Sequence, residues 1–143
     1  MAVMAATVGQ SIPHNTHTNL DFDTSVVDTN GLVDLTNNRF LPSEGLWKVT
    51  INVGWGGSTA GSRRIVVQEF DGTTTTTIRE IQSPGGQANV VWTHSYSFLY
   101  NCTGAVKLQF QVWQNSGASL STATFTPHPY TAEVSIEFCG KTS

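Results

Sequence analysis

Charged residues are scarce in this 143-residue chain, since Asp, Glu, Lys and Arg together make up only 12% of it, about half the share of an ordinary globular domain. The formal net charge is −3, and the seven Lys and Arg are scattered apart from Arg63 and Arg64. The basic stripe that attracts a phosphate backbone is therefore missing, which argues against nucleic-acid binding. A weakly charged surface instead favours a chain that is partly covered by copies of itself or by partners.

Long apolar runs and an export signal are also missing. The longest uninterrupted apolar stretches fall far short of the roughly 20 residues that a membrane-spanning helix needs. The opening Met1–Ala6 has neither a basic flank nor an extended apolar core, so it does not match a secretory signal peptide. We therefore expect a protein that is made in a cytoplasm and has no membrane partner.

Only two cysteines are present, Cys102 and Cys139, which is too few for a disulfide scaffold, and two free thiols are the favoured interpretation. Neither cysteine has a neighbouring His or a helix start that would activate its thiol. No Gly-x-Ser-x-Gly elbow or other nucleophile-presenting motif occurs. The sequence therefore argues against an enzyme.

A metal site is the other chemistry to weigh. His14 and His17 lie three residues apart, with Asp21 and Asp23 close behind, and this grouping is open to interpretation as a ligand cluster. Ordinary polar residues of an extended N-terminal segment are the favoured alternative. The Asp residues also lack the spacing of a known calcium loop. We expect neither a metal nor any other cofactor.

What the chain does contain is alternation of apolar and polar residues with a period of two, which is the pattern of half-buried strands. Segments 46–55, 105–113 and 131–139 all show it. In 89–100 the inward face is largely aromatic, and His94 is expected there as a hydrogen-bonded core histidine. The expected core consists of Trp47, Val49, Ile51, Val53, Trp92, Tyr96, Phe98, Leu108, Phe110, Val134, Ile136 and Phe138.

These segments predict the fold class. Turn signals such as Asp28–Gly31 and Asp71–Gly72 separate them, and consecutive apolar residues at Ile65–Val67 are typical of a central strand covered on both faces. Helical periodicity is absent. We predict one all-β domain, an antiparallel jelly-roll sandwich of two sheets with roughly eight to ten strands. Residues 1–19 would form an N-terminal arm with the first strand, and residues 20–143 the jelly roll.

Several motifs occur in a distinctive order. Arg39–Pro42 leads into Gly45–Val49 as an apolar-Pro and Gly-aromatic entry to a long strand, Gln114–Gly117 forms a turn, and Ala132–Phe138 closes the chain as a core strand. In order and spacing these motifs resemble the tumour necrosis factor and complement globular-head superfamily, in particular its bacteriophage members. The resemblance implies a protein that works by binding and assembling.

The resemblance also implies a topology for the two cysteines. In that topology the strand that begins near Ala105 and the strand that ends at Cys139 run parallel in one sheet, on either side of 63–70. Cys102 and Cys139 would then lie at opposite ends, too far apart for a disulfide, whose α-carbons must lie within roughly 7 Å.

A second implication concerns the outward face of the central strands, which carries Val66, Gln109, Gln111 and Trp113. In the resembling family this sheet packs around a threefold axis, so these four residues are expected to form a homotrimer interface. The alternative is a monomer on which Trp113 is a singly exposed aromatic.

Three non-enzymatic roles follow from the resemblance: a capsid decoration protein, a tail or fibre module that binds a host receptor, and a secreted signalling-type ligand. The last is least favoured, because no export signal is visible. A fibre tip usually follows a coiled-coil or collagen-like shaft, whereas this chain begins its strands almost at once. We therefore expect a decoration protein on a virion surface, made in the host cytoplasm.

Partner contacts differ between these roles. A decoration protein would bind the major capsid protein, and the apolar start of the arm is the expected docking segment, through Met1, Val3, Met4 and Val8. A receptor-binding module would instead carry a glycan or protein site in end loops such as 54–61 or 83–87. The sequence leaves this choice open.

Overall fold

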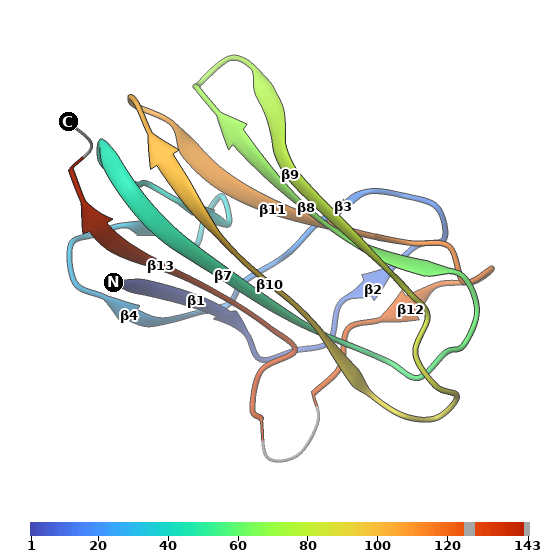
Figure 1. Cartoon of the computed structure of the whole chain (residues 1–143). Helices are drawn as coiled ribbons and strands as arrows, with labels where there is room; N and C mark the ends of the chain where they lie inside the picture. Colours follow the sequence, from blue (N-terminus) through green and yellow to red (C-terminus); the bar gives the residue numbers. More distant parts are fainter. Residues whose placement is uncertain (125–127, 142–143) are drawn as a thin grey trace.

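Two antiparallel sheets packed face to face make up the computed structural model, which describes residues 1–124 and 128–141 (Figure 1). In spatial order the first sheet contains β10 (Trp92–Cys102), β7 (Gly45–Trp55), β13 (Ala132–Gly140), β1 (Ala2–Ala6) and β4 (Thr24–Asp28). The second contains β5 (Val33–Asp34), β6 (Arg39–Phe40), β11 (Lys107–Gln114), β8 (Ser62–Phe70) and β9 (Thr75–Pro84), with β3 (Thr18–Asn19) paired to β11. A short ribbon joins β2 (Ser11–Ile12) to β12 (Leu120–Ser121).

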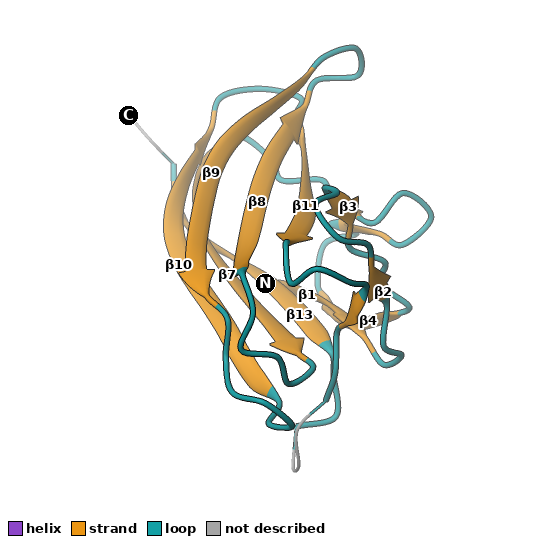
Figure 2. Cartoon of the chain, turned by 90° about the vertical axis from the view of Figure 1, so that its right-hand side faces the viewer, coloured by secondary structure: helices purple, strands orange, loops and turns teal. Residues whose placement is uncertain are grey.

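This arrangement confirms the predicted all-β, antiparallel jelly-roll sandwich. Eight strands in the described residues have five or more residues, in line with the predicted number. None of the described residues form a helix that is long and apolar enough to cross a membrane. Figure 2 shows the two layers from the side, with strands β9 and β10 side by side along one edge of the sandwich.

The core lies where the inner faces of the two sheets meet. Val49 and Ile51 on β7 are fully buried, as is Leu108 on β11, and each such side chain contributes about 1.5–3 kcal/mol relative to exposure. Phe110 packs edge-on against Phe40, with ring centroids 6.0 Å apart. Of the residues expected in the core, the structure buries Trp47, Val49, Ile51, Val53, Leu108, Phe110, Val134 and Ile136.

The other four expected core residues are more accessible. Trp92, Tyr96 and Phe98 are only half-buried, because β10 is the last strand of its sheet and receives neighbours on one side only. For Phe138 the prediction is wrong, since it is 44% exposed.

Phe138 is exposed because it lies at the open end of the sandwich. It pairs with Trp47 in register, and the two rings contact edge-on at 5.1 Å. The register then shifts before Gly140. Phe138 borders a groove that is also lined by Glu44 and Lys141. The alternation of apolar and polar residues in β13 therefore extends one inward position beyond the last buried layer of the core.

Strand order corrects the expected topology of the cysteines. Strands β11 and β13 belong to different sheets, and β8 lies between β11 and β9. Cys102 and Cys139 therefore lie near the same end of the first sheet, with β7 between their strands. Cys102 is buried, Cys139 is exposed, and both are free. Two strand spacings of about 4.8 Å separate the backbones by more than a disulfide allows.

Candidate functional site

The face expected to form the trimer interface is already covered by the chain itself. Val66 is only 2% exposed and Trp113 only 9%, so neither presents an apolar surface, contrary to the sequence argument. The Arg64 guanidinium lies 4.4 Å from the Trp113 ring centroid, and the His17 ring lies 6.4 Å away on a tilted plane. The indole is thus shielded by a cation and an imidazole.

The two glutamines of that face are also engaged within the chain. Gln109 donates to Gln68 at 2.9 Å and accepts a bond from Arg39 at 2.9 Å. Gln111 donates to the Asn19 side chain at 2.8 Å. A trimer interface at these four residues stays a prediction, and it would have to be a polar one.

The N-terminal segment is part of the sandwich. Strand β1 lies between β13 and β4, and all five of its residues are buried, including Val3 and Met4. The expectation of a free arm that docks through Val3 and Met4 is therefore wrong. Both faces of β1 are buried, which is why the segment shows no alternation of apolar and polar residues. Met1 and Val8 remain accessible, at 49% and 70% exposure.

A partly accessible apolar surface runs along the edge formed by β9 and β10. The half-buried Tyr96 and Phe98 stack with ring centroids 5.4 Å apart, and the Arg79 guanidinium lies 5.2 Å from the Phe98 ring. From β9, the half-buried Ile78 and Ile81 pack against the core at the same edge. Because both strands end their sheets, inward-facing side chains here are covered on one side only, and a second polypeptide would complete their burial.

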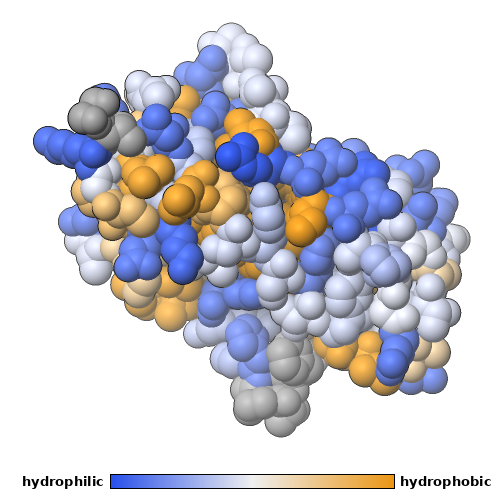
Figure 3. Space-filling view, viewed as in Figure 1, coloured by the Kyte–Doolittle hydropathy of each residue, from blue (hydrophilic) through white to orange (hydrophobic). Residues whose placement is uncertain are grey.

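A smaller apolar patch lies at one end of the first sheet. In Figure 3 the hydrophobic colour gathers over the ends of β7, β10 and β13, on a face that is otherwise mostly polar. Leu99, which is 57% exposed, lies on the outer face of β10 at this end. Leu99 follows Phe98 in the sequence but points to the opposite face of the sheet.

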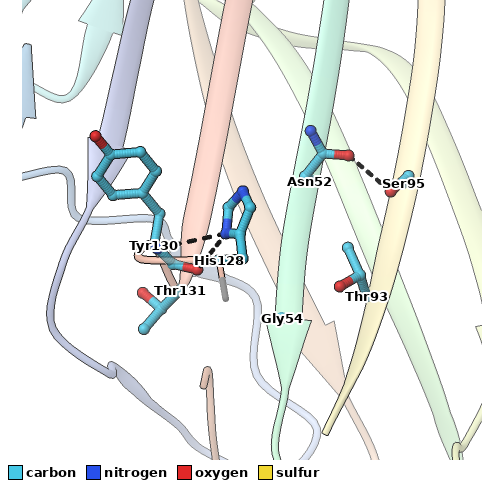
Figure 4. A pocket seen from close by; sticks show the side chains of 7 residues that line it. All are labelled: Asn52, Gly54, Thr93, Ser95, His128, Tyr130 and Thr131. Carbon is cyan, nitrogen blue, oxygen red and sulfur yellow. Dashed lines mark hydrogen bonds between the residues drawn. The ribbon is translucent and has the colours of Figure 1, made fainter. Parts of the chain in front are cut away.

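A polar groove lies on the outer face of the first sheet, towards its other end (Figure 4). Asn52 and Ser95 face each other across β7 and β10, and the Ser95 hydroxyl donates to Asn52 Oδ1 at 2.7 Å. Gly54 pairs with Thr93 and leaves the groove floor without a side chain. The segment that contains His128 and Tyr130 forms the opposite wall. The groove holds about 370 Å³ and is lined by Asn52, Gly54, Thr93, Ser95, His128, Tyr130 and Thr131.

Hydrogen bonds hold the groove wall against the sheet. The Thr131 hydroxyl donates to the carbonyls of Ala6 and Val8, at 3.3 and 3.1 Å, and the Gly54 amide donates to the Thr131 carbonyl at 2.8 Å. His128 Nδ1 lies 3.1 Å from the Tyr130 carbonyl oxygen. The aromatic wall is therefore positioned by the strands that form the floor.

Buried polar groups gather between the two sheets at the same end. His94 is 5% exposed and neither ring nitrogen has a hydrogen-bond partner in the described residues, so the expected hydrogen-bonded histidine is not observed. Burial lowers the pKa of His94 below its usual value. Arg63, fully buried, donates to the carbonyls of Ser58, Ala60 and Ser62.

A hydrogen bond between the two sheets involves the most strongly perturbed titratable group. The buried Tyr100 hydroxyl of β10 donates to the Glu69 carboxylate of β8 at 2.6 Å. Burial raises the pKa of Tyr100, and the bond to Glu69 raises it further. The pair therefore joins the layers and has the geometry of a structural link.

Comparisons with known proteins give a fold. No protein-family model and no curated protein matches the sequence. Among solved structures, the globular domain of zebrafish complement 1qA protein aligns with a TM-score of 0.67 at 8% identity, over 99% of this chain and 98% of that chain. Murine APRIL aligns with a TM-score of 0.67 at 9% identity, over 96% and 97%. The chain shares their jelly-roll fold. At such low identity the likeness carries no activity or partner across.

The polar residues of the N-terminal segment lie apart in the structure. Within the described residues, no group of three or more His, Cys, Asp or Glu side chains is placed to hold a metal ion. His14 accepts a bond from the Gly117 amide and His17 lies beside Trp113, while Asp23 accepts bonds from Thr7. The two histidines and the aspartates that follow them are thus used separately.

The groove itself was not predicted from the sequence. Alternation correctly places Asn52 and Ser95 on the polar side of their strands, but only the register between β7 and β10 brings them together. The sequence did not indicate that Tyr130 lines a groove, because its position depends on how residues 128–131 fold back over the sheet. The loops 54–61 and 83–87, expected to carry a receptor site, lie beyond this groove and do not line it, except at Gly54.

Proposed function

We propose that the chain is a structural protein of a virion, a bacteriophage capsid decoration protein that forms a homotrimer and binds the major capsid protein. The order of sequence motifs that resembles phage members of the superfamily supports the virion assignment. The accessible aromatic edge of β9 and β10 supports self-assembly, and it is the observation that carries this proposal.

The assembly proposal rests on incomplete burial at that edge. Tyr96 and Phe98 lie on the inward face of β10, yet both are half-buried. Burying them against a second copy would add favourable apolar contact, at about 25 cal/mol for each Å² removed from water. Arg79 lies over the Phe98 ring, so the edge also carries a cation that can fix the orientation of a neighbour.

Binding to a capsid needs accessible residues as well. Of the four expected docking residues, Met1 and Val8 keep exposed side chains, whereas Val3 and Met4 are committed to the sheet. We therefore propose that the N-terminal region docks on the capsid through Met1 and Val8, which lie on either side of β1.

Molar mass in solution tests the assembly. Light scattering should give about three times the chain mass of 15.4 kDa for the wild type. Phe98→Glu should give a folded monomer, while the control Ser97→Glu, on the exposed outer face of the same strand, should stay trimeric. Circular dichroism checks that each variant is folded, and Tyr96→Lys serves if Phe98→Glu does not fold. A wild-type monomer would contradict the trimer.

Partner identity needs a second experiment. Capsids stripped of the protein and, separately, host cell envelopes are incubated with the purified wild type and sedimented. Co-sedimentation with capsids supports the decoration role. Co-sedimentation with envelopes alone would overturn it in favour of the second candidate, a tail or fibre receptor-binding module, which the polar groove favours.

A further inference from the structure

We propose that the polar groove of Asn52, Thr93, Ser95 and Tyr130 binds a neutral carbohydrate. The proposal concerns ligand recognition by the isolated chain and is independent of the trimer and of capsid binding. It rests on the hydrogen-bonding groups of the floor, on the rings of the wall, and on the absence of charge among the lining residues.

The floor presents unused hydrogen-bonding groups. Asn52 Oδ1 accepts from Ser95 at 2.7 Å, which orients the amide and leaves its two N–H groups without a partner among the described residues. The Thr93 hydroxyl is buried and also has no partner there. Such groups cost free energy unless a ligand or water satisfies them. Both lie on the same face of adjacent strands, and the Asn52 amide is the one that a ligand in the groove reaches directly, because the Thr93 hydroxyl is buried.

The hollow beside these groups is built into the sheet. Gly54 is the residue opposite Thr93, and a Cβ atom at position 54 would clash with the carbonyl oxygen of Ala123. A side chain is thus excluded at position 54, because the backbone of Ala123 packs closely against the strand there. The volume of about 370 Å³ falls within the roughly 300–1,000 Å³ of small-molecule sites.

The wall adds aromatic rings. His128 and Tyr130 meet edge-on, with ring centroids 5.7 Å apart and planes at 82°, and in Figure 4 the His128 ring is the nearer of the two to Asn52. Sugars combine hydroxyl groups with faces of C–H bonds. An amide, hydroxyls and an aromatic ring together recognise both parts, because polar groups fix orientation while the ring covers the apolar face.

Charge decides the class of sugar. Of the seven lining residues none is Asp, Glu, Lys or Arg. A sulfated, phosphorylated or sialylated glycan would bring an anion into a groove without a fixed cation, where the lost hydration is not repaid. The lining therefore favours a neutral saccharide over an anionic one.

Saturation-transfer NMR on the purified wild type tests the groove. The probes are methyl glycosides of galactose, glucose, mannose and N-acetylglucosamine, with sialyllactose as the anionic comparison. We expect transfer to at least one neutral glycoside and none to sialyllactose. Asn52→Ala should weaken that binding about tenfold or more, because it removes the amide that the ligand satisfies.

Thr50→Ala is the matched control, since Thr50 lies on the same strand and face and bonds to Ser97 at 3.0 Å, outside the groove. It should bind like the wild type. His128→Leu removes the ring that lies nearer the floor and should also weaken binding, with the fold checked by the NMR spectrum. No transfer to any neutral glycoside, equal binding by Asn52→Ala, or transfer to sialyllactose alone would each overturn the proposal. None of these results depends on whether the chain is a trimer.

Discussion

Tyr100 on β10 and Glu69 on β8 meet at 2.6 Å and link the two sheets through a hydrogen bond from the phenol to the carboxylate. Tyr100→Phe removes this bond and leaves the carboxylate without its donor. We expect the free energy of unfolding to fall by about 1–3 kcal/mol, measured by urea denaturation. Tyr96→Phe is the control, because the Tyr96 hydroxyl makes no hydrogen bond in the described residues, and its effect should be within about 0.5 kcal/mol.

The same pair makes stability depend on alkaline pH. The folded pKa of Tyr100 is raised above its usual value near 10.0, so the unfolded chain loses the proton first. The contribution to stability is therefore complete below pH 10 and is lost as the pH rises further. Urea midpoints between pH 8 and 11 should fall more steeply for the wild type than for Tyr100→Phe. Parallel curves would contradict the assignment.

His94 predicts a separate loss of stability in mild acid. Its folded pKa is lowered from 6.5 by burial, so the unfolded chain takes up the proton at a higher pH than the folded one. Stability should fall as the pH drops below 6.5. Denaturation at pH 7, 6 and 5 should show a smaller loss for His94→Leu than for the wild type.

Gly45 tests the packing at the open end of the sandwich. Its φ of +140° is disfavoured for other residues, and an added Cβ atom would lie 2.5 Å from the Phe138 ring. Gly45→Ala should destabilise the fold by about 2 kcal/mol or more. Gly104→Ala, where nothing lies within 4 Å of the added atom, should change the free energy of unfolding by less than about 0.5 kcal/mol. Equal effects in thermal melts would exclude the contact as the cause.

Trp113→Glu should lower the stability of the folded chain itself, whatever effect it has on an interface. The indole is 9% exposed beneath Arg64 and beside His17, so the substitution buries a carboxylate and should cost about 3 kcal/mol of stability. Gln109→Glu changes the same face more gently and is the better probe of a polar trimer interface there. Light scattering on Gln109→Glu should show an unchanged mass if the aromatic edge forms the trimer.

Alternation predicted the faces of strands well but not their neighbours. Segment 46–55 became β7, and Val49 and Ile51 are fully buried as predicted. In β10 the same argument put Tyr96 and Phe98 on the correct face, yet their burial depends on a strand that would have to lie beyond the sheet edge. A period of two contains no information on whether that neighbour exists.

The opposite case explains the misread N-terminus. Ala2–Ala6 lacks alternation because both faces of β1 are covered, the same reason that Ile65–Val67 reads as continuous apolar sequence. The latter segment was identified as a central strand because it is β-branched and flanked by a clear pattern. Alanine and methionine carry no such strand preference, so β1 could be placed only by its partners β13 and β4.

Those partners also set the order in which the domain can form. Ala2 pairs with Ile136, so the first sheet is complete only after nearly the whole chain has been synthesised. The hydrogen bonds between β1 and β13 therefore form late. Pairing over such sequence separation loses much loop entropy before any contact is gained, and it is typical of folding on a scale of milliseconds to seconds. During that interval Ala2–Ala6 can pair only with β4, and its other edge is the one through which two nascent chains would exchange strands or aggregate.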